Sequence, residues 1–223
     1  NQEDLSPIQK AMVECGGTQC GYCTPGFVVA MTAGLMDESI PLDDSGADYA
    51  ISGNLCRCTG YRSIKQAGRS AIAELESKIV DRPRIEALCE SGALPGYFQE
   101  IPARLEAIPN VEIEPPTNTP FIAGGTDLFV QQGGELPRKR ASLLNLTELE
   151  PIRIEESNIV IDARETFESF GRHPLIRKCI PSIAAYNEAI ASWAIRERAT
   201  LGGNICNASP IADMTALLSL IHI

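Results

Sequence analysis

The chain has 223 residues and a formal net charge of -10, with 44% hydrophobic and 22% charged residues. This length is enough for one or two domains with buried cores. The acidic balance argues against a nucleic-acid-binding surface, and the isolated histidines His173 and His222 give no sign of a histidine-based active site. The longest mainly apolar stretch, residues 27–36, is far shorter than the ~20 residues that span a bilayer, so membrane insertion is not expected.

Helix signals dominate the first 80 residues. Ser6 is a capping residue followed by Pro7, which suits the first helical position, and apolar residues then recur at helical spacing. The pair Thr24-Pro25 repeats this start signal, and Ser63 opens a segment with the apolar stripe of an amphipathic helix. The sequence predicts helices at residues 6–16, 24–35, 48–51 and 63–79.

Residues 81–112 are rich in proline, which breaks long helices and favours a connector between domains. One short helix is expected around this stretch, at residues 101–108. The sequence therefore predicts a helical domain at residues 1–80, a Pro-rich linker at residues 81–112 and a second domain at residues 113–223.

Short β-rich runs separated by turns and helical stretches follow the linker, and this mixture predicts an α+β domain. The last six residues are similar to the translation of a sequencing adapter, and the chain begins with Asn1 rather than Met. We therefore expect the natural ends to be missing and exclude residues 218–223 from the predicted fold. The predicted strands are residues 121–123, 143–146 and 158–161, and a predicted helix covers residues 183–194.

Two cysteine pairs, Cys20-Gly-Tyr-Cys23 and Cys56-Arg-Cys58, fall near predicted turns between the helices of the first domain. Four thiolates gathered there can bind a soft metal, and spacing alone leaves both an iron–sulfur cluster and a structural zinc ion open. Disulfides are disfavoured in an intracellular compartment. The other cysteines have no paired spacing and are expected to be buried free thiols without a role; they are Cys15, Cys89, Cys179 and Cys206.

The second domain contains two glycine pairs. Ile122-Ala-Gly-Gly-Thr-Asp127 follows a predicted strand, where a missing Cβ lets backbone N–H groups approach a phosphate. A structural turn is the default for one such signal, because it is not the GxGxxG fingerprint. The second cluster, Thr200-Leu-Gly-Gly-Asn204, followed by polar groups at residues 208–213, makes a nucleotide site the better interpretation.

The segments around these cysteines and glycines resemble one known family. Residues 19–26 and 53–61 are similar to the helical [2Fe-2S] domain of the molybdenum hydroxylases, the family of xanthine dehydrogenase, aldehyde oxidase and carbon monoxide dehydrogenase. The glycine segments are similar to the FAD domain found beside it. This resemblance implies an all-α four-helix [2Fe-2S] domain followed by a partial α+β FAD-binding domain of the PCMH type.

The resemblance also implies two sets of site residues. The implied metal ligands are Cys20, Cys23, Cys56 and Cys58. The implied FAD contacts are Phe121, Ile122, Ala123, Gly124, Gly125, Thr126, Asp127, Leu128, Thr200, Leu201, Gly202, Gly203, Asn204 and Asp213.

An electron-transfer role follows from the resemblance, with no catalytic residue in this chain. Electrons would pass from a molybdenum site through the [2Fe-2S] cluster to FAD and on to NAD⁺. Molybdopterin would belong to a partner subunit or domain, with Gln19 beside its pterin, in an oligomeric cytoplasmic assembly without nucleic-acid or membrane partners. Arg57 lies between two implied ligands, and its positive charge is expected to favour the reduced cluster.

Fusion of the two domains on one chain favours xanthine dehydrogenase or aldehyde oxidase over the carbon monoxide enzymes, with xanthine or hypoxanthine as the family-level substrate. An electron-transfer part of aldehyde oxidase, a zinc-stabilised interaction module and a flavoprotein oxidase that reacts with oxygen stay open as alternatives. The family usually has Asn at the position of Glu197 and Gly at that of Asp162. Its FAD domain also continues beyond the last residue of this chain.

Overall fold

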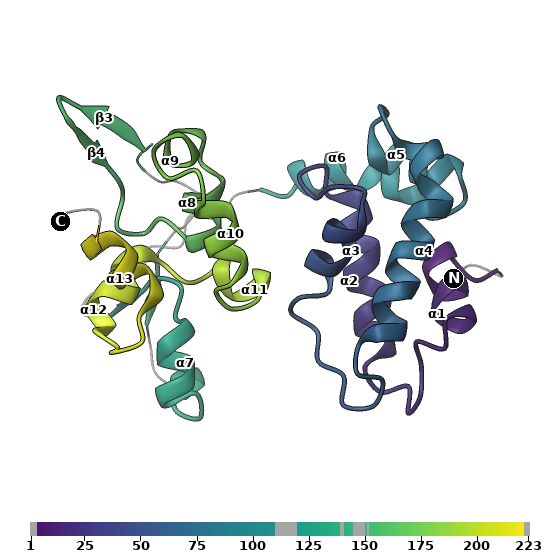
Figure 1. Cartoon of the computed structure of the whole chain (residues 1–223), viewed down its shortest axis with the longest axis horizontal. Coiled ribbons are helices and arrows are strands. Elements are labelled where there is room, and N and C mark those ends of the chain that lie inside the picture. The colour runs from purple at the N-terminus through teal and green to yellow at the C-terminus, as the bar shows by residue number, and fades with distance from the viewer. Residues whose placement is uncertain (1–3, 110–119, 139–140, 145–149, 151, 221–223) are drawn as a thin grey trace. The chain divides into compact units, whose positions relative to one another are not determined.

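The computed structural model describes residues 4–109, 120–138, 141–144, 150 and 152–220. The chain divides into two compact units, residues 1–111 and residues 112–223 (Figure 1). The first unit is helical, and the second mixes helices with four short strands among its described residues. The general prediction, a helical domain followed by a domain of helices and few strands, is confirmed.

The first helix of the first unit begins where a local capping signal places it. Ser6 accepts a hydrogen bond from the backbone N–H of Gln9, whose side chain accepts one from the backbone of Ser6, and this capping box fixes the start of the first helix. The helices are α1 (Pro7–Glu14), α2 (Thr24–Met36), α3 (Asp44–Ala50), α4 (Arg62–Ile79), α5 (Arg84–Glu90), the 3-10 helix η1 (Gly96–Glu100) and α6 (Ile101–Glu106).

Two predicted helix starts in this unit were wrong. Helix α3 begins at Asp44 rather than at residue 48, because the Asp43 side chain caps it by accepting a hydrogen bond from the N–H of Gly46 at 2.9 Å. Helix α4 begins at Arg62, directly after Tyr61, which has a left-handed backbone with φ of 67°. Ser63 therefore lies inside the helix and does not cap it.

One apolar core holds the first unit together, and its central side chains Phe27, Ile64 and Leu75 are completely buried. Helix α5 contributes the buried Ala87 and Leu88 to the same core. The stricter prediction of a four-helix domain is therefore not confirmed, because part of the Pro-rich stretch is helical and packs with α1 to α4.

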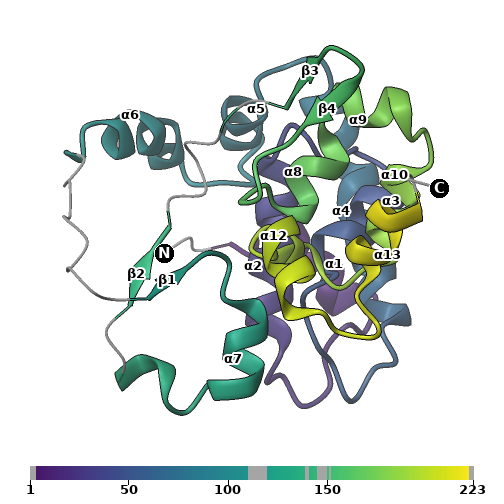
Figure 2. The same cartoon turned by 90° about the vertical axis from the view of Figure 1, so that its left-hand side faces the viewer.

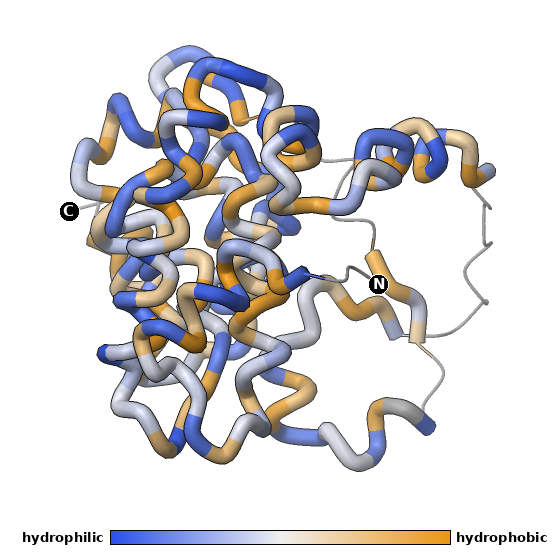
Figure 3. Tube along the Cα trace, turned by 90° about the vertical axis from the view of Figure 1, so that its right-hand side faces the viewer, coloured by the Kyte–Doolittle hydropathy of each residue, from blue (hydrophilic) through white to orange (hydrophobic). Residues whose placement is uncertain are grey.

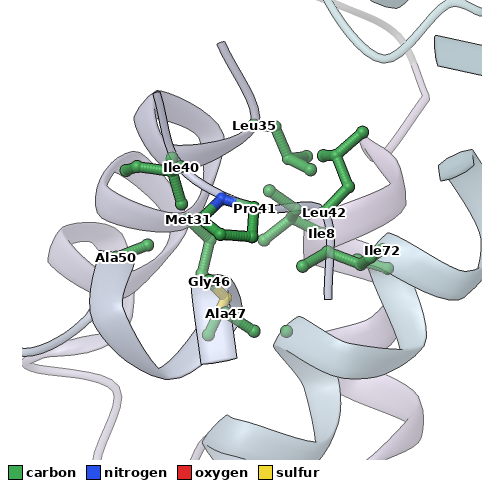
Figure 4. Close-up of a pocket in the computed structure, with 13 residues that line it drawn as sticks. Ile8, Met31, Leu35, Ile40, Pro41, Leu42, Gly46, Ala47, Ala50 and Ile72 are labelled. Carbon is green, nitrogen blue, oxygen red and sulfur yellow. The ribbon is translucent and has the colours of Figure 1, made fainter. Parts of the chain in front are cut away.

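A small apolar gap of about 20 Å³ lies inside this core (Figure 4). Met31, Ala47 and Ile72 face it, and Gly34 lets α2 and α3 approach closely, since a Cβ there would lie 2.5 Å from the Cβ of Ala50. This volume is about that needed for one water molecule, and the lining offers a water no polar side chain. The gap is a packing feature of the core.

The second unit contains two separate two-stranded sheets (Figure 2). In the parallel sheet Phe121 pairs with Ser142, and in the antiparallel sheet Ile154 pairs with Ile159. Its elements are β1 (Phe121–Ile122), α7 (Thr126–Gln132), η2 (Leu136–Arg138), β2 (Ser142–Leu143), β3 (Arg153–Glu155), β4 (Asn158–Val160), α8 (Phe167–Arg172), α9 (Pro174–Cys179), α10 (Ile183–Glu188), α11 (Trp193–Arg196), α12 (Leu201–Asn207) and α13 (Asp213–Leu220).

Several predicted boundaries in this unit differ from the structure. The predicted strand at residues 143–146 begins one residue earlier, and its last two residues lie outside the described residues. Strand β3 was not predicted. Residues 218–220 continue α13, and Leu218 packs against the apolar core of the second unit, called the second core below, so these residues belong to the fold. Residues 221–223 lie outside the described part of the chain.

The predicted helix at residues 183–194 is broken into α10 and α11. The break is at Ala191, which has a left-handed backbone with φ of 46°. The Arg196 guanidinium donates hydrogen bonds to the carbonyl oxygens of Ile190 (3.1 Å) and Ala191 (2.9 Å). These two carbonyls are held by a side chain instead of continuing a helix.

Arg196 also forms the buried ion pair of the second core. Its Nε donates to Glu168 Oε2 at 2.7 Å, and the side chains are only 2% and 8% exposed. Arg172 donates to the other oxygen of this carboxylate at 2.8 Å. The pair joins α8 to α11 beside the apolar side chains of Phe170, Ile183 and Met214.

Among the described residues, no helix is long and apolar enough to cross a bilayer. Figure 3 shows polar and apolar residues interspersed along the helices.

Replacing Arg196 with Met should lower the free energy of unfolding of the second unit by about 3 kcal/mol or more, because Glu168 would lose its most buried partner. The fluorescence of Trp193, the only tryptophan in the chain, reports urea unfolding of this unit. The matched control is Arg153→Met, which removes the exposed pair with Glu155 and should cost about 1 kcal/mol or less. Equal losses in the two variants would contradict the assignment.

Candidate functional site

The four predicted metal ligands lie together in the first unit. Cys20 and Cys23 are in the turn before α2, and Cys56 and Cys58 are in the turn before α4. All four are free thiols. They line one hollow of about 430 Å³ together with Tyr22, Leu55, Arg57 and Tyr61.

Contacts between the turns arrange the sulfurs in two pairs. The Sγ atoms of Cys20 and Cys58 are 3.6 Å apart, and Cys23 and Cys56 lie close enough for each thiol to shift the pKa of the other. Each pair therefore takes one cysteine from each turn. Within the described residues, no group of three or more His, Cys, Asp or Glu side chains is arranged to hold a single metal ion.

The second cysteine turn is fixed by its own hydrogen bonds. The backbone N–H of Cys56 donates to Tyr61 Oη at 3.0 Å, and the ring of Tyr61 packs edge-on against the buried Phe27 with centroids 6.4 Å apart. Gly60 and Tyr61 both have left-handed backbones, with φ of 62° and 67°. Non-glycine residues rarely adopt this conformation, so the packing of the tyrosine ring holds the turn closed.

Each sulfur pair contains one thiol with a lowered pKa and one with a raised pKa. Hydrogen bonds from the side chain and backbone of Thr59 lower the pKa of Cys56 to about 7, while burial raises that of Cys23. A hydrogen bond from the backbone of Tyr22, followed by one from Cys58, lowers the pKa of Cys20, and the same contact with Cys20 raises that of Cys58. Thiolates are the metal-binding form, so one sulfur of each pair is favoured as a ligand before a metal arrives.

This donor set fits a cluster held by cysteine thiolates. Four free sulfurs from two turns border one hollow, and four cysteines are the usual ligand set of a [2Fe-2S] cluster. The two pairs of sulfurs match the need for two ligands on each of two irons.

A cleft of about 690 Å³ in the second unit contains most of the predicted FAD contacts. All of residues 121–128 line it, as do Thr200, Gly203, Asn204 and Asp213. Leu201 and Gly202 do not: Leu201 is buried in the core, and the two residues donate their N–H groups to the carbonyls of Glu165 and Ala163. The volume is in the range of small-molecule sites.

The glycines of this cleft serve packing within the protein before any ligand. A Cβ on Gly124 would lie 1.6 Å from the carbonyl oxygen of Arg198, so only glycine lets these two segments touch. A Cβ on Gly203 would lie 2.8 Å from Thr200 Oγ1, which caps α12 by accepting the Gly203 N–H. The sequence left both a structural turn and a phosphate contact open for Gly124, and its packing against Arg198 gives the glycine a structural role that joins the two halves of the cleft.

Several polar side chains of the cleft already have partners. Asn204 Oδ1 accepts hydrogen bonds from the N–H and hydroxyl of Thr215, both at 2.9 Å, so its NH₂ group is the part left to donate to a ligand. Gln131 donates to Asp127 at 2.5 Å and to Asn207 at 3.3 Å, which links α7 to α12. The cleft is thus a defined arrangement of donors and acceptors.

Sequence reasoning missed about half of the cleft lining. Gln131 is one helical turn after Asp127, and helical spacing was the signal that could have identified it. None of the residues lining the cleft in the described part of the chain is Lys or Arg. The missed lining residues are Val130, Gln131, Leu144, Phe167, Ile195, Ala199, Cys206, Asn207, Ser209, Ile211 and Ala212.

Both departures from the family pattern have local roles. Glu197 accepts a hydrogen bond from Trp193 Nε1 at 2.7 Å. Asp162 accepts hydrogen bonds from the side chain and backbone of Arg164, and these contacts hold the pKa of its carboxyl well below the usual range. Neither residue lines the cleft.

The structure also places Gln19, Arg57 and the four cysteines that lie outside the two pairs. Gln19 and Arg57 are both exposed next to the clustered cysteines. Cys15 and Cys89 are half-buried, whereas the prediction of burial was wrong for Cys179 and for Cys206, which lies on the cleft wall.

Comparison with known families gives two matches. Residues 1–69 match the model described as "[2Fe-2S] binding domain", and residues 99–222 match "FAD binding domain in molybdopterin dehydrogenase". The first match contains the four clustered cysteines, and the second contains the cleft.

Similar proteins are oxidoreductases by name. "Xanthine dehydrogenase" from Oryza sativa subsp. japonica is 24% identical over 292 residues, covering 97% of this chain and 21% of the relative. "6-hydroxypseudooxynicotine dehydrogenase complex subunit beta" from Paenarthrobacter nicotinovorans is 46% identical over 63 residues, covering 28% of this chain and 39% of the relative. "Aldehyde oxidase 1" from Oryctolagus cuniculus is 52% identical over 63 residues, covering 28% and 5%.

The chain therefore spans well under half the length of each of these relatives. The second family match covers more than half of the chain and all of the cleft. The chain belongs to the family of FAD binding domains in molybdopterin dehydrogenases, and it carries a [2Fe-2S] binding domain before that region.

Proposed function

We propose that this chain is the electron-transfer part of a xanthine dehydrogenase-like molybdenum hydroxylase. Cys20, Cys23, Cys56 and Cys58 would hold a [2Fe-2S] cluster, and the cleft of the second unit would hold FAD. The observation that carries the proposal is the convergence of four free cysteines from two turns on one hollow. The names of the relatives support the same reaction class.

The cluster, when bound, would accept and release single electrons. The protein's contribution is to hold the ligand sulfurs and limit their movement during this change of charge. Tyr61 does this on one turn, because its hydroxyl fixes Cys56 and its ring is packed on the core. Exposed Cys20 and Cys58 leave one side of the hollow open to solvent or to a partner protein.

FAD would be held in the cleft chiefly by hydrogen bonds. Because the lining residues in the described part of the chain include no Lys or Arg, the pyrophosphate would depend on backbone N–H groups and on donors such as the NH₂ of Asn204. Asp127 and Asp213 are acceptors suited to ribose or ring N–H groups rather than to phosphate.

The wider context of the proposal comes from the family resemblance of the sequence. Electrons would arrive from a molybdopterin-binding subunit or domain beside Gln19 and leave FAD for NAD⁺, in an oligomeric cytoplasmic assembly. An aldehyde oxidase-type electron-transfer part is the alternative, since the short matches to those enzymes have the higher identity. NADH-dependent bleaching of bound flavin in the full assembly would support the NAD-linked version, and its absence would favour the oxidase.

Anaerobic reconstitution with iron and sulfide should give about two irons and two acid-labile sulfides per chain. Cys58→Ala should lose most of this iron, because one sulfur of the Cys20 pair is removed. The matched control is Cys179→Ala, which removes another exposed free thiol and should retain the iron. Retention of zinc alone by the wild type would contradict the proposal and support a structural metal site.

Replacing Gly124 with Ala should weaken FAD binding by tenfold or more, about 1.4 kcal/mol, because the new Cβ would push away the Arg198 carbonyl and open the cleft. Titration of the chain with FAD, followed by flavin fluorescence, measures the change. Gly134→Ala is the control, since its Cβ would meet no atom within 4 Å. Unchanged FAD affinity in the Gly124 variant would remove the cleft from the proposal.

Replacing Arg57 with Ala should lower the reduction potential of the reconstituted centre, because a nearby positive charge favours the reduced state. Arg62→Ala removes an equal charge at the start of α4, outside the hollow, and should have the smaller effect. A redox titration of both variants gives the answer, and identical potentials would show that Arg57 is only a solvated side chain.

A further inference from the structure

Thr59 contacts the sulfur of Cys56 through two of its atoms, although neither its type nor its spacing marks it as a ligand. Its backbone N–H donates to Cys56 Sγ at 3.4 Å, and its hydroxyl oxygen lies 3.2 Å from the same sulfur. The sulfur of Cys56 therefore receives two contacts from one residue.

The second contact has a defined direction. Tyr61 N–H donates to Thr59 Oγ1 at 3.2 Å, which occupies an acceptor site of the hydroxyl. A metal-bound Cys56 is a thiolate and can only accept. The Thr59 hydroxyl must then donate to the sulfur, and the Tyr61 N–H helps to orient it for this purpose.

The position of this hydroxyl is fixed by the core of the first unit. Tyr61 accepts the Cys56 N–H through its own hydroxyl and packs its ring on Phe27, which is completely buried. Thr59 lies between Cys56 and Tyr61 in the sequence, in a turn that contains the left-handed Gly60. Its hydrogen bond is therefore set before a metal is bound. Cys20 and Cys58 differ, because both are exposed and open to water.

We propose that Thr59 is a positioning residue that raises the reduction potential of the metal centre by donating its hydroxyl hydrogen bond to the Cys56 sulfur. This inference rests on the proposed function, because it requires a cluster on the four cysteines. Reduction adds one electron and makes the ligand sulfurs more negative, and a donor aimed at a sulfur stabilises that state more than the oxidised one. The step moves no proton.

Thr59→Val tests the inference, because it removes the hydroxyl while keeping the shape of the side chain and the backbone N–H. The reduction equilibrium of the reconstituted full chain should become about tenfold less favourable, equal to a fall of 59 mV for a one-electron couple. Thr59→Ser keeps a hydroxyl and should restore the wild-type potential. The measurement is a redox titration followed by the low-temperature EPR signal of the reduced centre.

Two further readouts separate tuning from a structural effect. Thr18→Val is the matched control, because the Thr18 hydroxyl is hydrogen-bonded to the hydroxyl of Thr24 at 3.1 Å and not to a cysteine sulfur among the described residues, so the potential should be unchanged. Thermal unfolding and iron content are measured on each variant. A fall in potential in a Thr59→Val protein with normal iron content supports tuning.

The outcomes distinguish this inference from the proposed function. A normal EPR signal in the wild type together with an unchanged or higher potential in Thr59→Val overturns the role of Thr59 alone. A fall in potential that Thr59→Ser does not reverse also overturns it. Absence of any reduced-state signal in the wild type overturns the cluster assignment and the role of Thr59 together.

Discussion

The packing of Tyr61 on Phe27 is the contact on which the metal site depends. It keeps a non-glycine residue in a left-handed conformation, which costs free energy that only surrounding structure can offset. The same residue accepts the N–H of Cys56 and starts α4. The core of the first unit therefore sets both the direction of a long helix and the position of one of the four clustered sulfurs.

The second unit uses a comparable device in its cleft. The approach of Gly124 to the Arg198 carbonyl joins the two glycine segments. The segment after Arg198 is hydrogen-bonded along residues 163–167, directly before the helix whose Glu168 binds Arg196. A buried ion pair and one glycine contact thus determine where the predicted FAD contacts lie, although neither charged residue lines the cleft. The positions of the residues that line the cleft therefore depend on buried residues that do not line it.

The sequence was most informative where local chemistry decides the structure. Proline after a capping residue marked the start of α1, and Pro25 marked that of α2, although Thr24 lies inside α2 and does not cap it. The cysteine spacing identified the residues that gather at the hollow. Predictions failed where contacts with residues distant in the sequence determine the local structure. Gly60 marks a turn, but no sequence signal indicates that Tyr61 is also left-handed, and Ala191 is not a usual helix breaker. The break there depends on carbonyls held by Arg196 from α11. Likewise, the role of Gly124 could not be predicted without knowing that residue 198 lies against it.

The central claim is that the four clustered cysteines form a two-iron electron carrier. The most direct test is quantitative low-temperature EPR of the anaerobically reconstituted chain before and after dithionite reduction. The account predicts no signal in the oxidised state and, after reduction, about one unpaired electron for every two irons. A chain that binds metal through these cysteines but has no EPR signal in either state would contradict the account and return the cysteines to a structural role.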